Sequence, residues 1–186
     1  MRGHHSVEWS SRSGWVVRFV SAAVLGGMIG GAVKAGALAL EHMAFLPHFL
    51  SVSASHISAI ILIGGFGIVP FNTFRVRWVG ELLVQLAVLA LTLLAAFYPG
   101  QDQPFAFLLF PVLAWAALRF GVAVVLIEVT CVSIASVVLG AFGGGSFAHA
   151  AAGAPVLFMG LNQLFTLSLS VSMLLLATLQ DDHNSM

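Results

Sequence analysis

The strongest constraint on this chain is its division into six long apolar runs that contain very few charges. The runs cover Trp15–Leu40, Ser53–Phe71, Val79–Tyr98, Phe105–Arg119, Gly121–Ala141 and Pro155–Leu179. A helix needs about 20 apolar residues to cross a bilayer, and all but the fourth run reach an adequate length. The fourth is shorter and contains Pro111, which favours a kink or a partial crossing.

Composition points the same way. Only 8% of the 186 residues are charged, whereas soluble proteins carry about 25%, so the chain cannot cover a soluble surface. The sequence therefore predicts an all-α integral membrane protein, a bundle of about six transmembrane helices with a short fourth span. We expect residues 1–14 to form a polar cytoplasmic tail, 15–180 the six-helix membrane domain, and 181–186 a cytoplasmic tail. The formal net charge of zero gives no reason to expect nucleic acid as a partner.

Lysine and arginine are distributed unevenly between the two ends of these spans. With a cytoplasmic N-terminus, one side holds Arg2, Arg12, Arg18, Arg75, Arg77 and Arg119. The loops on the other side, 41–52, 99–104 and 142–154, contain neither lysine nor arginine. Because positively charged loops stay in the cytoplasm, both termini are predicted to be cytoplasmic.

The same asymmetry explains Arg119, a cation between two apolar runs. It is predicted to anchor a tight helical hairpin at the cytoplasmic interface, where Trp15, Trp78 and Trp115 form an aromatic belt. Lys34 is the exception, near the outer end of the first helix, from which its side chain can reach outward.

Small residues recur every four positions along the first span, Gly27 and Gly31 among them. Such stripes let membrane helices approach closely. We expect a tight helix contact within one subunit, with a homodimer seam as the alternative.

Glu128 is the acidic residue placed deepest in a span, about 10 Å from the cytoplasmic end by helix rise. Gln85 lies at similar depth on the third span, and Arg18 lies nearer the interface. A structural hydrogen bond or ion pair is one interpretation, and a sensing or proton-linked role is the other. We expect a neutral acid that is hydrogen-bonded to a neighbour such as Gln85, rather than a carboxylate paired with Arg18.

Polar residues recur on one face of the last span, where Asn162, Thr166 and Ser170 are four apart and Gln163 is adjacent. The spacing predicts a stripe that faces the bundle interior. It either lines a ligand cavity or joins helices through polar contacts worth about 0.6 kcal/mol each, and the second alternative is favoured.

Four histidines map to the outer side, and they are predicted to be ordinary interfacial residues. They are His42, His48, His56 and His149. Histidine binds metals or haem, but these four are expected in different segments with no two on one helical face. Metal or haem ligation stays open, and no cofactor is assigned.

The segment 142–155 is expected to be a flexible outer loop. It lacks the strand and helix that a phosphate-binding loop requires. The sequence shows no catalytic pairing of a nucleophile with a general base, no GxSxG motif and no HExxH motif. The sequence therefore predicts a protein that is not an enzyme.

Two stretches, "FLLFPVLAWAALRFGVAVVLIEV" and "LNQLFTLSLSVSMLLLATLQ", carry a family resemblance. They resemble the C-terminal part of a bacterial membrane-associated sensor (MASE) domain of the first type. The matching features are Pro111, the AxRFG motif at 117–121, the glycines at 143–145, and QLF at 163–165. "GGFGIVPF" and the 77–81 region resemble its middle helices more loosely, so the resemblance covers about residues 50–180.

The resemblance implies a multi-pass protein of the bacterial inner membrane. The family's early helices with a Trp-Pro-Pro-like segment are lacking here, and no kinase or cyclase output domain follows "QDDHNSM". A truncated sensor of this kind would bind a ligand or a partner membrane protein that signals for it. The alternatives are an accessory structural subunit of a respiratory or photosynthetic complex and the substrate-binding subunit of an energy-coupling-factor-type transporter.

Overall fold

A computed structural model describes residues 12–68, 78–100, 103–151 and 153–185. Their order is α1 (Arg12–Leu40), α2 (Phe45–Ile68), α3 (Val79–Ala96), the 3-10 turn η2 (Phe105–Leu108), α4 (Leu109–Arg119), α5 (Val122–Ala141), α6 (Gly145–Ala150) and α7 (Pro155–Ser185). The predicted all-α class is confirmed for these residues, which contain no strand.

Five helices are long and apolar enough to cross a membrane, namely α1, α2, α3, α5 and α7. The predicted fourth span is the shorter apolar segment formed by η2 and α4. Pro111 lies in the first turn of α4, where the missing backbone N–H breaks no helical hydrogen bond. The chain is therefore a multi-pass membrane bundle in which the short segment packs against α3, α5 and α7.

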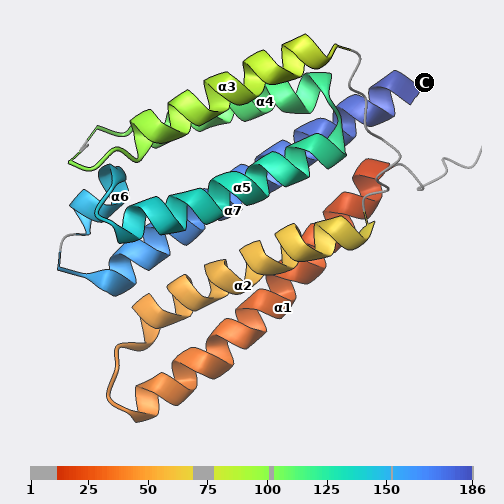
Figure 1. Ribbon diagram of the computed structural model, residues 1–186. Coiled ribbons are helices and arrows are strands. Elements are labelled where there is room, and N and C mark those ends of the chain that lie inside the picture. Colours follow the sequence, from red (N-terminus) through yellow and green to blue (C-terminus); the bar gives the residue numbers. More distant parts are fainter. Residues whose placement is uncertain (1–11, 69–77, 101–102, 152, 186) are drawn as a thin grey trace, which may run out of the picture.

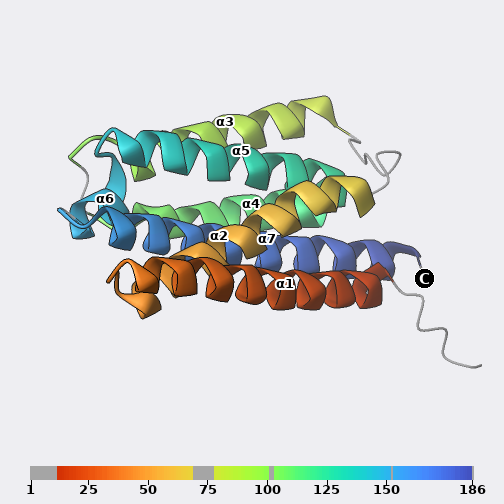
Figure 2. The ribbon, with the colours of Figure 1, turned by 90° about the horizontal axis from the view of Figure 1, so that it is seen from below.

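The connections divide between two ends of the bundle. The α1–α2 turn, the C-terminal end of α3, and α6 lie at one end, whereas the α4–α5 turn and the C-terminus lie at the other (Figures 1 and 2). We name these the outer and inner ends, after the sidedness that the Lys and Arg pattern predicts. The segment 69–77, which contains Arg75 and Arg77, is outside the described residues.

The first two helices pack through glycines. A Cβ atom on Gly27 would lie 2.9 Å from the backbone nitrogen of Ile57, and one on Gly31 would lie 2.9 Å from that of Ser53. Real Cβ atoms essentially never approach so closely, so both positions require glycine. The predicted tight contact within one subunit is therefore confirmed.

Three boundaries differ from the sequence-based expectations. Helix α2 begins at Phe45 rather than near Ser53, so most of the expected loop 41–52 is helical. Helix α7 continues to Ser185, and Asp181 in the expected tail is buried. The Gly-rich segment 142–154 contains helix α6 and is not simply a loop.

Helix α6 forms because aromatic packing holds this segment against the bundle. Phe147 packs on Phe97, with ring centroids 6.4 Å apart, and on Phe165 of α7, at 5.3 Å. Gly145 has a φ of +83°, a conformation that glycine adopts without strain. The segment's own sequence favours a flexible loop, but contacts with Phe97, directly after α3, and Phe165 of α7 hold it in a helix. The local sequence pattern does not reveal these contacts.

Candidate functional site

The two polar residues at matching depth on α3 and α5 meet inside the bundle. The Gln85 side chain donates through Nε2 to Glu128 Oε2 at 2.9 Å. Gln85 is fully buried and Glu128 is 3% exposed. The predicted hydrogen bond between these residues is therefore present, and it joins α3 to α5.

This pair has one unsatisfied acceptor on each side chain. Gln85 Oε1 and Glu128 Oε1 are both buried without a hydrogen-bond partner among the residues that the structure describes. No ion pair joins Glu128 to Arg18, whose side chain is exposed. The alternative in which Glu128 is a carboxylate paired with Arg18 is thus not the arrangement observed in the described chain.

The predicted polar stripe on α7 faces the interior, as expected. Asn162, Thr166 and Ser170 are all at most 3% exposed. Ser170 donates to the backbone carbonyl of Thr166 at 2.7 Å, which is a local bond within the helix. The stripe is therefore buried, but Ser170 contributes no polar contact to another helix through this bond.

Asn162, Gln163 and Thr166 line a groove formed by α2, α5 and α7. The groove consists of an outer cavity of about 300 Å³ and a deeper one of about 310 Å³. Both cavities are lined by Ser55, Val137 and Gln163, so they adjoin one another. We call the two together the α7 groove. Ligand pockets commonly have volumes of this order, about 300–1,000 Å³.

Two buried polar atoms on side chains that line the groove have no hydrogen-bond partner within the described residues. Asn162 Oδ1 is unpaired on a side chain only 1% exposed, and Thr166 Oγ1 is unpaired on one 3% exposed. Across the groove, Ser58 of α2 donates to the backbone carbonyl of Gln163 at a long 3.5 Å. Buried polar groups are normally satisfied, so Asn162 Oδ1 is suited to accept a hydrogen bond, and the Thr166 hydroxyl to donate or accept one, with a bound molecule or water.

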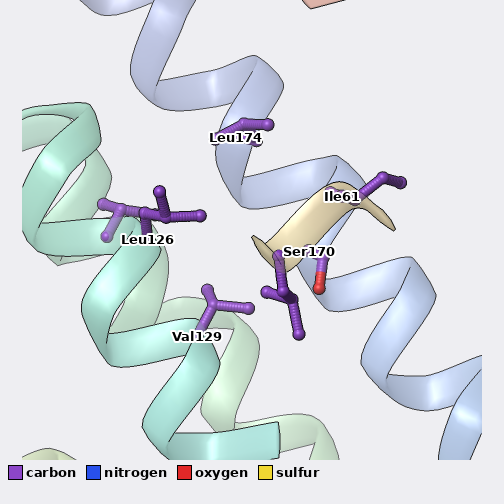
Figure 3. A pocket seen from close by; sticks show the side chains of 7 residues that line it. Ile61, Leu126, Val129, Ser170 and Leu174 are labelled. Atoms are coloured by element: carbon purple, nitrogen blue, oxygen red, sulfur yellow. The ribbon is translucent and has the colours of Figure 1, made fainter. Parts of the chain in front are cut away.

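The groove is closed toward the inner end by apolar packing. Ile61 of α2, Val129 and Leu126 of α5, and Ser170 and Leu174 of α7 converge there (Figure 3). The space left between them admits no water molecule. In the described part of the chain, the α7 groove therefore ends inside the bundle.

The outer cavity has a cation and an imidazole among its lining residues, Lys34 of α1 and His56 of α2. The Nδ1 atom of His56 lies 2.8 Å from the carbonyl oxygen of Val52. Because a carbonyl oxygen only accepts, Nδ1 carries the hydrogen. The Nε2 atom of a neutral His56 is then an acceptor. The outer part of the groove thus offers one positive charge and several hydrogen-bonding groups.

At the inner end, Arg119 forms a polar cluster that joins the short segment to α3. Its Nε and Nη2 atoms donate to Glu81 Oε1 and Oε2 at 2.7 and 2.9 Å. Trp115 Nε1 also donates to Glu81 Oε1, at 3.3 Å. Arg119 is 57% exposed, as expected for an interface anchor, while Trp15 and Trp78 are exposed near the same end.

The outer histidines do not assemble into a metal site within the described residues, which contain no cluster of three metal-ligating side chains. Contrary to the expected separate segments, His48 and His56 share helix α2. They are eight residues apart, a rise of about 12 Å, which is too far to share an ion. His42 lies in the α1–α2 turn and His149 on α6.

The five polar residues singled out inside the membrane lie in two places. Gln85 and Glu128 pair between α3 and α5, whereas Asn162, Gln163 and Thr166 line the α7 groove. Sequence reasoning did not identify Glu81 as the partner of Arg119, or Lys34 and His56 as groove residues. Counting residues from the helix ends could have paired Glu81 with Arg119. No such count indicates that Lys34 and His56 line the groove.

Comparisons with known proteins identify no relative. No family model matches the chain, and neither the search of curated proteins nor the search of solved structures finds a match.

Proposed function

We propose that this chain is a non-enzymatic membrane protein that binds a ligand in the α7 groove and communicates its occupancy to a partner protein. The resemblance to a membrane-associated sensor domain supports this function. The observation that carries it is the pair of unpaired acceptors, Asn162 Oδ1 and Thr166 Oγ1, buried at a groove that is closed at one end. Leaving such atoms unpaired costs about 1–3 kcal/mol each, and a ligand that donates to them removes that cost.

The groove also suggests how occupancy is communicated. Its walls belong to α2 on one side and α5 on the other, with Lys34 of α1 at the outer cavity. A molecule between these walls has contacts with both the α1–α2 hairpin and α5. Binding therefore favours one spacing of the hairpin, and a partner that contacts α1 or α2 would respond to that spacing.

The test is whether a small molecule remains bound through gentle purification in nanodiscs, measured by mass spectrometry. The parent protein should retain a stoichiometric compound, and the variant Asn162→Leu with Thr166→Val should lose it. Thr178→Val is the matched control, because Thr178 is equally buried on α7 but donates to the carbonyls of Leu174 and Leu175.

Equal retention by all three proteins, or no retained compound in any of them, would contradict the proposal. Co-purification with the subunits of a respiratory or photosynthetic complex, with no compound in the groove, would instead support a structural accessory subunit. ATPase subunits accompanied by a bound vitamin or metal would support the transporter alternative.

A further inference from the structure

We infer that the ligand of the α7 groove is an anionic glycerophospholipid with hydroxyl groups on its head, taken from the outer leaflet. This inference rests on the proposed ligand-binding function and specifies its chemistry. Its first support is charge. Lys34 is the sole lysine of the chain, and the three predicted outer loops contain no lysine or arginine. Among the described residues, Lys34 is thus the one lysine or arginine toward the outer end. It lines the groove, where its charge favours a negative group on the ligand.

The second support is depth. Helix α1 has 29 residues and α7 has 31, so each is longer than the roughly 20 residues that cross the hydrocarbon core. Lys34 lies six residues before the outer end of α1, and Asn162 lies seven residues after the start of α7. Both are thus about 10 Å from the outer helix ends. This places them at the level where the phosphate and glycerol of a lipid meet the hydrocarbon.

The third support is the hydrogen-bonding chemistry of Asn162 and Thr166. Asn162 Oδ1 has no partner and is only an acceptor, so it requires a donor such as a head-group hydroxyl. The Thr166 hydroxyl, also unpaired, can donate to an ester carbonyl. Lys34 and Asn162 lie at one level, which suits a phosphate and a head-group hydroxyl beside it. Thr166 is one helical turn deeper, which suits the ester that follows the phosphate toward the tails.

The fourth support is the apolar wall. Ile134, Val137 and Val138 of α5 line the deeper cavity and are 43–61% exposed, so this wall faces both the groove and the surrounding acyl chains. An acyl chain can lie along it without leaving the bilayer. The closed inner end, at Ile61 and Val129, admits no water and limits the polar part of the ligand to the outer half.

The experiment compares two lipids on the purified protein. Native mass spectrometry of the protein, exchanged into vesicles of phosphatidylcholine with or without phosphatidylglycerol, counts the lipids that stay bound. We expect one phosphatidylglycerol to be retained and no phosphatidylcholine. Lys34→Gln should weaken that retention about fivefold, which corresponds to about 1 kcal/mol for one lysine near an anionic head. Arg18→Gln, at the opposite end of the same helix, is the matched control and should retain the lipid.

Asn162→Leu should also weaken the retention of phosphatidylglycerol. Phosphatidic acid, whose head has no alcohol hydroxyls, should bind the parent protein less well. Equal retention of phosphatidylcholine, or retention unaffected by Lys34→Gln, would overturn the lipid assignment. A bound non-lipid compound that Asn162→Leu removes would overturn it while leaving the ligand-binding function intact. If no molecule of any kind occupies the groove, both proposals fail together.

Discussion

Replacement of Glu128 by glutamine tests the protonation state of the buried pair. Gln85 Nε2 donates to Glu128 Oε2 at 2.9 Å, and each side chain has one further buried oxygen without a partner. A proton on Glu128 allows the acid to donate to the amide oxygen in return. Because an amide can donate in the same way, we expect Glu128→Gln to change the free energy of unfolding by less than about 0.5 kcal/mol, below the worth of a typical hydrogen bond.

Glu128→Leu should behave differently. It leaves Gln85, which is fully buried, with only the carbonyl of Val112 at 3.5 Å. The expected cost is about 1–3 kcal/mol for a buried donor that loses its partner. Adding Gln85→Leu removes both polar groups, and it should recover much of that loss, so the double-mutant cycle isolates the coupling of the pair.

The assay is thermal unfolding in detergent, with infrared detection of a protonated carboxyl band that Glu128→Gln abolishes. Destabilisation of Glu128→Gln by several kcal/mol, with no such band in the parent protein, would show a charged glutamate that depends on a cation. A large stabilisation would show a charged glutamate that has no partner. Either result would refute the reasoning.

Three further predictions concern the hairpins and the topology. Gly27→Ala should cost about 1–3 kcal/mol through overpacking, whereas Gly36→Ala, with no atom within 4 Å of the added Cβ, should not destabilise the detergent-solubilised protein. Arg119→Leu should lower the melting temperature more than Arg119→Lys, since only leucine removes the charge; equal melting curves would exclude the anchoring role. In a background without Cys131, a cysteine at Ser146 should react with an impermeant thiol reagent on intact cells, and one at Thr73 should not. The reverse labelling would invert the topology.

The interior pairing was predictable because helix depth can be counted along a sequence. Gln85 is six residues after the start of α3, and Glu128 is six after the start of α5. Both helices begin at the inner end (Figure 1), so equal counts bring the two side chains to one level. The same counting could have paired Glu81, near the start of α3, with Arg119 at the end of α4.

The groove was not predictable in this way. The four-residue spacing of Asn162 and Thr166 indicates that α7 has a polar face, but not whether other helices close over it. That depends on where α2 and α5 lie around α7. Glycine packing draws α2 toward α1 along Gly27 and Gly31, while α5 joins α3 through Glu128. Helix α6 was missed for a related reason, because its stability comes from Phe97 and Phe165 rather than from its own sequence.

The most direct test of ligand binding in the α7 groove is an experimental structure of the protein purified with its native lipids and determined in a bilayer. The account predicts an ordered molecule between α2 and α5 that contacts Asn162 and Thr166 and extends to Lys34. A groove filled by side chains of α2 and α5, with Asn162 Oδ1 hydrogen-bonded to a neighbouring helix, would contradict it.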